Sequence, residues 1–130
     1  MEKDLEEALI KHIIKFLLEL GAGFSCVGTQ YAVEVGGKEY DIHLLFYHLK
    51  LRCFVVAELK KGEFTPEHAG KPNFYLDAVD DLLKHSTDGP SIGILICKER
   101  NKVVAEYALR AINKPIGIVN MNSRRLFRKN

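Results

Sequence analysis

Four ionisable residues in the middle of the chain have the types and spacing of a metal-dependent phosphodiesterase site. Glu58 and Lys60 close one apolar run, and Asp41 and His43 open the run before it. Because side chains alternate across a strand, residues two apart project from the same face, about 6.6 Å apart along the backbone. If the two runs pair as an antiparallel hairpin, the four groups converge on one side of a sheet. There, carboxylates could hold a divalent ion and the lysine could offset charge on a phosphate, although an acid followed by lysine is also common at exposed strand ends.

The sequence around these residues resembles a known family. From position 35 to 85 it reads VGGKEYDIHLLFYHLKLRCFVVAELKKGEFTPEHAGKPNFYLDAVDDLLKH, and the similarity continues through 90–97 and 113–117. It resembles the nuclease-like C-terminal domain of the YhcG-type proteins, a branch of the PD-(D/E)XK nuclease superfamily. The resemblance implies an α/β fold with a restriction-endonuclease-like core, in which helices flank a mixed β-sheet in the order αβββαβαβ. It also implies a DNA-directed endonuclease that uses Mg²⁺ or Mn²⁺.

One position departs from the pattern that the resemblance implies. Relatives are expected to carry aspartate where this chain has His43, in the stretch that reads YDIHLLFYH here. Glu58 and Lys60 match the Glu-x-Lys of the family, which implies that Glu58 binds the metal and Lys60 orients the attacking water. The second carboxylate is then either displaced to Asp41 or lost. A histidine ligand at 43 would shift metal preference from magnesium toward manganese, zinc or iron, because imidazole is softer than carboxylate.

Three other positions are accessory candidates for the site. Gln30 is a polar amide in a strand-like apolar run, where it is either a hydrogen-bonded core residue or a site residue. In the superfamily an acid of the first helix sometimes joins the metal, which makes Glu6 or Glu7 a candidate, although a solvated or capping acid is the favoured interpretation. Tyr75 could reach the site or a substrate phosphate, but an aromatic residue at helical spacing is more often part of the core.

Three functions remain open on this sequence. The first is an active nuclease with an altered site, in which Asp41 or His43 acts with Glu58 and Lys60. The second is a domain that binds nucleic acid without cleaving it, and the third is an interaction domain that docks a partner protein. The resemblance implies that nucleic acid, above all DNA, is the partner. It also makes a homodimer a candidate assembly, and relatives commonly carry an additional N-terminal domain.

Hydrophobic periodicity predicts the elements that position these residues. A capping-box pattern at Asp4 starts an amphipathic helix that ends near Gly21. A strand over 24–35 and a Gly36-Gly37 turn lead into the two central runs, the second of which is apolar on both faces. A helix is predicted over 66–85, with a bend or late start at Pro72 and an apolar face that includes Phe74, Ala78 and Leu82. It is followed by a strand over 92–97, a helix capped by Asn101 and a strand over 116–119.

Length, composition and charge bound the class of protein. A chain of 130 residues that is 47% hydrophobic predicts a single domain over 1–130. The absence of a long apolar run or a signal-peptide pattern predicts a soluble, cytoplasmic protein with no membrane contact. Cys26, Cys53 and Cys97 are an odd number at wide spacing, which predicts buried reduced thiols. From residue 98 onward nine Lys/Arg stand against two Glu, so the basic tail at about 121–130 is either a phosphate contact or an inert end.

Overall fold

Residues 23–110 and 112–120 are described by a computed structural model of the chain. The predicted first helix, with Glu6 and Glu7, and the basic tail over 121–130 lie outside these residues. The elements, in chain order, are β1 (Phe24–Val35), β2 (Lys38–His48), β3 (Cys53–Glu63), the 3-10 helix η1 (Pro66–Ala69), α2 (Gly70–Leu82), β4 (Ile92–Glu99), α3 (Lys102–Arg110) and β5 (Ile116–Asn120).

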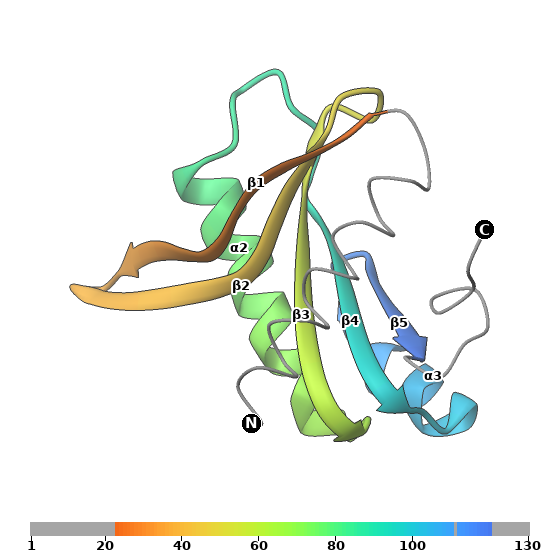
Figure 1. The fold of residues 1–130 in the computed structure, drawn as a ribbon. Helices are drawn as coiled ribbons and strands as arrows, with labels where there is room; N and C mark the ends of the chain where they lie inside the picture. Colours follow the sequence, from red (N-terminus) through yellow and green to blue (C-terminus); the bar gives the residue numbers. More distant parts are fainter. Residues whose placement is uncertain (1–22, 111, 121–130) are drawn as a thin grey trace.

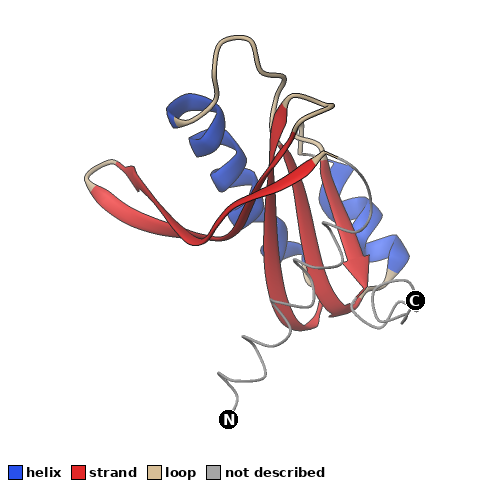
Figure 2. Cartoon of the chain, turned by 45° about the horizontal axis from the view of Figure 1, so that its top comes forward, coloured by secondary structure: helices blue, strands red, loops and turns tan. Residues whose placement is uncertain are grey.

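The strands form one mixed sheet in the order β1-β2-β3-β4-β5 (Figure 1). The first three are antiparallel neighbours, whereas β3, β4 and β5 run parallel to one another. Parallel neighbours need a crossover connection, and α2 and α3 provide the two that this sheet requires. Both helices lie on the same face of the sheet (Figure 2). The predicted α/β class and the mixed sheet are therefore confirmed.

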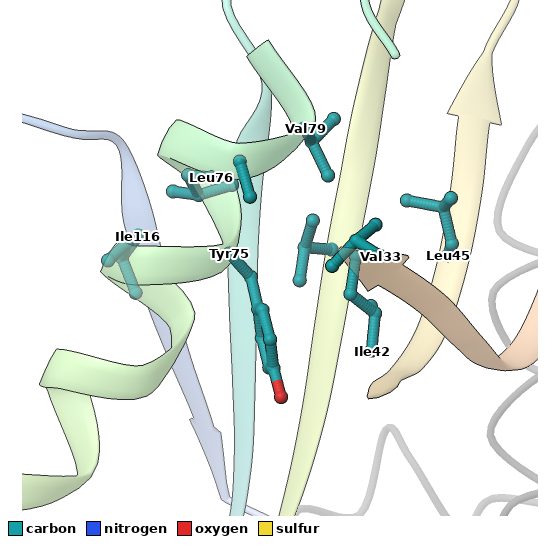
Figure 3. Packing of buried hydrophobic residues seen from close by; sticks show 9 residues of the cluster. Val33, Ile42, Leu45, Tyr75, Leu76, Val79 and Ile116 are labelled. Atoms are coloured by element: carbon teal, nitrogen blue, oxygen red, sulfur yellow. The ribbon is translucent and has the colours of Figure 1, made fainter. Parts of the chain in front are cut away.

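The central strand β3 is buried on both faces, as its sequence predicts. Val55, Ala57 and Leu59 pack in one apolar cluster, together with Phe46 of β2. Val56, between them, belongs to a second cluster on the face that α2 covers. Figure 3 shows this second cluster, in which residues of β1 and β2 meet the helix; its labelled members are Val33, Ile42, Leu45, Tyr75, Leu76, Val79 and Ile116.

The helix predicted over 66–85 has the late start that Pro72 suggested, but it buries a different stripe from the predicted one. A 3-10 turn precedes α2, which places Pro72 in the first helical turn, where its missing N–H costs no helical hydrogen bond. The predicted apolar face was wrong at Phe74 and Leu82, which are 37% and 53% exposed. Helical spacing allowed two overlapping faces, and contact with the sheet selects the buried one: Pro72, Tyr75, Leu76, Ala78 and Val79. Phe74 instead packs its ring against Tyr40 of β2, 4.9 Å away.

The cysteine prediction holds for two residues and fails for one. Cys53 and Cys97 are buried free thiols, whereas Cys26 is exposed. The reason is its strand, because β1 forms the edge of the sheet and its register with β2 shifts between Cys26 and Gly28. Within the described part of the chain, no helix has the length and apolar character needed to cross a membrane.

Thiol reactivity should separate the three cysteines. Burial raises the pKa of Cys53 and of Cys97, the latter against the opposing charge of Lys60, so both thiols hold little reactive thiolate near neutral pH. We expect Cys26 to react rapidly with a disulfide reagent and the other two to react fast only after unfolding. Mass spectrometry of the labelled native chain measures this, and rapid labelling at Cys53 in the native chain would contradict the described packing.

Removing the Phe46 ring should test the core on the face of the sheet opposite α2. Phe46 is fully buried, and truncation to alanine leaves a cavity. We expect Phe46→Ala to lower the free energy of unfolding by about 3–5 kcal/mol in urea titrations. The matched control is Leu51→Ala at an exposed turn position, which should change it by less than about 0.5 kcal/mol.

Candidate active site

A fork between β2 and β3 creates the candidate site. The two strands pair from His48 and Cys53 as far as Leu44 and Ala57, and there the ladder stops. Beyond this level the β1–β2 hairpin continues as an arm that bends away from the rest of the sheet (Figure 1). Glu58 of β3 and His43 of β2 are the next residues on each side, so the fork opens at the predicted site.

The neighbouring strand is irregular at the same level. Thr29 pairs with Leu44 and Tyr31 pairs with Ile42, whereas the intervening Gln30 has a positive φ of 48°. The strict alternation expected along β2 fails here, because Ile42 and Leu45 lie three residues apart yet pack in the same cluster. Bends in both strands at one level let the arm leave the sheet plane.

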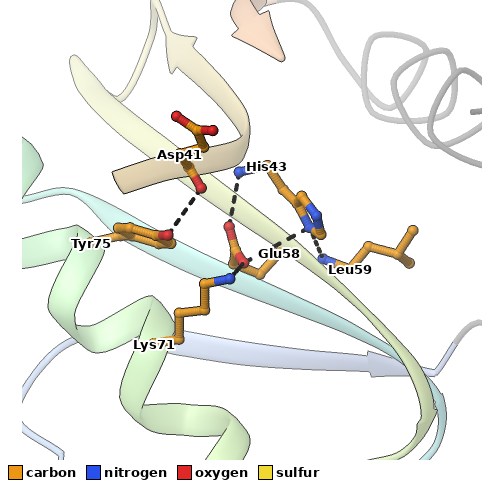
Figure 4. Close-up of polar contacts among 6 residues, drawn as sticks. All are labelled: Asp41, His43, Glu58, Leu59, Lys71 and Tyr75. Carbon is orange, nitrogen blue, oxygen red and sulfur yellow. Dashed lines mark hydrogen bonds and ion pairs between the residues drawn. The ribbon is translucent and has the colours of Figure 1, made fainter. Parts of the chain in front are cut away.

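Glu58 is a buried carboxylate in which only one of the two oxygens has a hydrogen-bond partner among the described residues. Its side chain is 0% exposed on the face that α2 covers. Oε2 accepts a hydrogen bond from the backbone N–H of His43 at 2.9 Å (Figure 4). Oε1 has no hydrogen-bond partner in the described part of the chain. Because a buried, unsatisfied carboxylate oxygen is costly, this atom is the strongest indication of a site that receives a cation or a donor.

His43 bridges the two strands where their ladder ends. Its ring Nδ1 accepts a hydrogen bond from the backbone N–H of Leu59 at 3.2 Å. The same nitrogen lies 3.8 Å from Glu58 Oε1, a distance that would be an ion pair only if Nδ1 carried a proton. The two interactions exclude each other, since a protonated Nδ1 cannot accept from Leu59. The shorter contact has good geometry, so we assign the ring proton to Nε2.

Lys71 is the cation that sequence reasoning missed. It lies in the first turn of α2, and its Nζ is 3.7 Å from Glu58 Oε1 and 5.7 Å from the centre of the Tyr75 ring. Figure 4 shows it reaching Glu58 from the helix side. The signal was present in the sequence, because Lys71 and Tyr75 are four residues apart and therefore share a helix face.

Tyr75 is a core residue whose hydroxyl makes a hydrogen bond beside the fork. Its side chain is buried in the core, and its hydroxyl donates a hydrogen bond to the backbone carbonyl of Asp41 at 2.9 Å. Burial first, then the charges of Glu58 and Asp41, raise its pKa to about 12. The phenol is therefore a neutral donor at physiological pH, and it ties α2 to the arm beside the fork.

The structure brings together only some of the predicted residues. Asp41 contributes its backbone carbonyl to the Tyr75 contact, and its residue is otherwise exposed. Lys60 is half-buried two positions after Glu58 but makes no hydrogen bond or ion pair with Asp41 or Glu58 in the described residues. The side chain of Gln30 is exposed on the edge strand. Across residues 23–110 and 112–120, no group of three or more His, Cys, Asp or Glu side chains could hold a metal ion.

An alkaline titration should isolate the Tyr75 hydroxyl. We expect one of the five tyrosines to ionise near pH 12 in the folded chain, and this step should disappear in Tyr75→Phe. Since the folded pKa exceeds the unfolded value of about 10, the unfolded chain binds fewer protons between these values. The contribution to stability is therefore complete below pH 10 and is lost as the pH rises toward 12.

Absorbance at 295 nm follows the ionisation. Glu58→Gln should lower the midpoint of the Tyr75 step because it removes a nearby negative charge. A native chain without a step near pH 12, in which Tyr75→Phe removes absorbance only from the transition at lower pH, would contradict the buried hydrogen-bonded placement.

Comparison with known proteins gives a consistent result. A family model described as "YhcG PDDEXK nuclease domain" matches residues 1–128. The Escherichia coli K12 protein named "Putative nuclease YhcG" is 38% identical over 111 residues, which is 85% of this chain. The chain spans 30% of the length of that relative.

Solved structures share the fold at low sequence identity. A repair endonuclease from Pyrococcus abyssi matches with a TM-score of 0.58 and 13% identity, over 92% of this chain and 46% of that one. The structure of an EndoMS–dsDNA2 complex matches with a TM-score of 0.57 and 15% identity, over 87% and 46%. The restriction-endonuclease-like fold expected from the sequence is confirmed. By the match across nearly its whole length, the chain belongs to the family of YhcG PDDEXK nuclease domains.

Proposed function

We propose that this chain is a divalent-metal-dependent endonuclease domain that hydrolyses phosphodiester bonds in DNA at the β2–β3 fork. One observation carries the proposal: Glu58 is fully buried at the fork, and its Oε1 has no hydrogen-bond partner among the described residues. Membership of a nuclease-domain family supports the reaction class. The whole-protein context remains part of the proposal, because the curated relative is about three times longer.

The residues at the fork fit a magnesium- or manganese-type site. Such ions take oxygen ligands and commonly bind one or two protein carboxylates, with waters and substrate phosphate completing the shell. Glu58 would hold the ion through Oε1, and the exposed carboxylate of Asp41 is the candidate for a second oxygen ligand. His43 Nδ1 accepts the Leu59 amide N–H, so this atom is not proposed as a metal ligand. When bound, the ion supplies Lewis-acid polarisation of the phosphate and a water of lowered pKa.

Three residues around Glu58 have separate proposed roles in the reaction. His43 fixes the Glu58 carboxylate by donating its backbone N–H to Oε2. Lys60, two residues along the same strand, is proposed to orient the attacking water and to offset charge that develops on the phosphate. Tyr75 is committed to the Asp41 carbonyl, so its role is to hold α2 against β2 and not to contact substrate.

DNA is the proposed substrate and partner. A protein of similar fold, EndoMS, has been solved as a complex with dsDNA. In this chain Lys98, Arg100 and Lys102 are exposed where β4 ends, and β4 runs parallel to β3 in a register that places Lys60 beside Cys97. Exposed cations near a proposed hydrolytic site favour contact with a phosphate backbone. A homodimer and an additional N-terminal domain are further proposals taken from the family resemblance.

A second candidate function is nucleic-acid binding without hydrolysis. It is favoured by the commitment of His43 Nδ1 to the Leu59 amide and by the lack of a three-ligand group in the described residues. In this case His43, in place of the expected aspartate, would leave the site without its second carboxylate. The fold and the exposed cations at Lys98, Arg100 and Lys102 would remain.

Metal-dependent cleavage distinguishes the two functions. We expect the native chain to nick plasmid, single-stranded or branched DNA in Mn²⁺ or Mg²⁺ and not in chelator. Glu58→Gln, which keeps the side-chain size, should lower the rate by at least about 100-fold because it removes the anionic ligand. His43→Asp should raise the rate in Mg²⁺, since it restores a hard oxygen ligand.

The matched control is Asp81→Asn, an exposed acid of α2 on the opposite side of the helix from the buried stripe, which should cleave like the native chain. Cleavage that survives in Glu58→Gln would refute the proposed site. Cleavage that appears only in His43→Asp, with chelator-resistant DNA binding by the native chain, would establish the second function.

A further inference from the structure

We propose that Lys71 is a built-in counter-ion that neutralises Glu58 when no metal is bound and competes with the divalent ion for Oε1. The inference rests on the proposed function and adds a residue that the family's Glu-x-Lys pattern does not include. The ammonium group of Lys71 would stabilise the ionised Glu58 carboxylate in the metal-free chain and would weaken the binding of a metal ion to it.

The buried carboxylate of Glu58 requires a compensating charge. Glu58 is 0% exposed, and from residues 23–110 and 112–120 it receives one hydrogen bond, from the backbone N–H of His43 to Oε2. A single neutral donor leaves most of the cost of burying an ionised carboxylate uncompensated. The folded chain without metal therefore needs a positive charge close to Oε1.

Lys71 places a positive charge beside Glu58 Oε1. Within the described part of the chain, two nitrogens approach Oε1: His43 Nδ1 at 3.8 Å and Lys71 Nζ at 3.7 Å. The histidine nitrogen already accepts the Leu59 N–H and so presents a lone pair, which repels a carboxylate oxygen unless the ring is reoriented. Lys71 carries a full positive charge and points at the same oxygen (Figure 4).

The geometry of the Lys71–Glu58 contact allows the ammonium group to be displaced. At 3.7 Å the pair is outside hydrogen-bond distance, so it is held by Coulomb attraction alone. The Lys71 side chain is 46% exposed, and a lysine stem can move its ammonium group into water without disturbing the core. Its other described contact, with the face of the Tyr75 ring, would help to keep it beside the site.

Competition with the metal follows from these positions. A divalent ion bound to Oε1 would place like charges within a few ångströms of each other, because Nζ already lies next to that oxygen. Binding of the ion must therefore drive the ammonium group outward, and the lost attraction weakens the apparent affinity for the ion. In the metal-free chain, the Lys71 ammonium group compensates the buried charge of Glu58.

Mn²⁺ titration of the full chain tests this competition. We expect Lys71→Met, which keeps the apolar stem, to bind Mn²⁺ about fivefold more tightly than the native chain in isothermal titration calorimetry. In chelator the same variant should unfold at a lower temperature than the native chain, and saturating Mn²⁺ should narrow this gap. Lys71→Arg, which keeps the charge, should resemble the native chain.

A double-mutant cycle with Glu58→Gln shows whether the effect acts through this carboxylate. In the Glu58→Gln background, Lys71→Met should no longer lower the unfolding temperature in chelator. Lys50→Met, at an exposed position of the β2–β3 turn, controls for the loss of one positive charge and should leave Mn²⁺ affinity unchanged.

The outcomes separate this inference from the proposed function. Mn²⁺ binding that is equal or weaker in Lys71→Met overturns the counter-ion role and leaves the nuclease proposal standing. A destabilisation by Lys71→Met that persists in the Glu58→Gln background also overturns it. If neither the native chain nor Lys71→Met binds Mn²⁺, the proposed metal site fails and the competition fails with it.

Discussion

The burial of the Glu58 carboxylate is the constraint on which the arrangement of β2, β3 and α2 around it depends. Glu58 lies on the central strand of the sheet, under α2, where an ionised group is costly unless its surroundings compensate for it. The backbone N–H of His43 satisfies one oxygen, and it is available because β2 leaves the β3 ladder at that residue. Separation of the strands and burial of the acid therefore depend on each other.

The helix α2 completes the arrangement from one side of the sheet. Its buried stripe places Tyr75 against the arm and Lys71 beside the uncommitted oxygen of Glu58. A neutral phenol anchors the strand backbone, whereas a half-exposed ammonium group faces the carboxylate. The helix thus supplies a buried, hydrogen-bonded contact and a half-exposed charge, and the proposed competition with a metal ion depends on that charge.

The parts of the fold that follow from periodicity were predictable, and those that follow from tertiary contact were not. Alternation along β3 and the glycine turn before β2 are local patterns, and the structure confirms the strands that they predict. The exposure of Cys26 depends on its strand lying at the sheet edge, which no local pattern encodes. The buried stripe of α2 likewise depends on which of two overlapping faces meets the sheet.

The candidate site shows the same division. The pairing of the two central runs brings His43 and Glu58 together, as the hairpin argument predicts. The bend in β2 breaks the alternation expected from the sequence, and the contact of Asp41 with Tyr75 is made by its backbone carbonyl and not by its carboxylate. Lys71 lies thirteen residues after Glu58 in the sequence, and only the crossover of α2 over the sheet brings the two together.

The most direct test of the account is a crystal structure with Mn²⁺, examined by anomalous scattering at the manganese edge. The account predicts an anomalous peak bonded to Glu58 Oε1, with the Lys71 ammonium group displaced toward solvent. A manganese peak away from the fork, or a fork without manganese in which Lys71 still faces Glu58 at saturating metal, would contradict it.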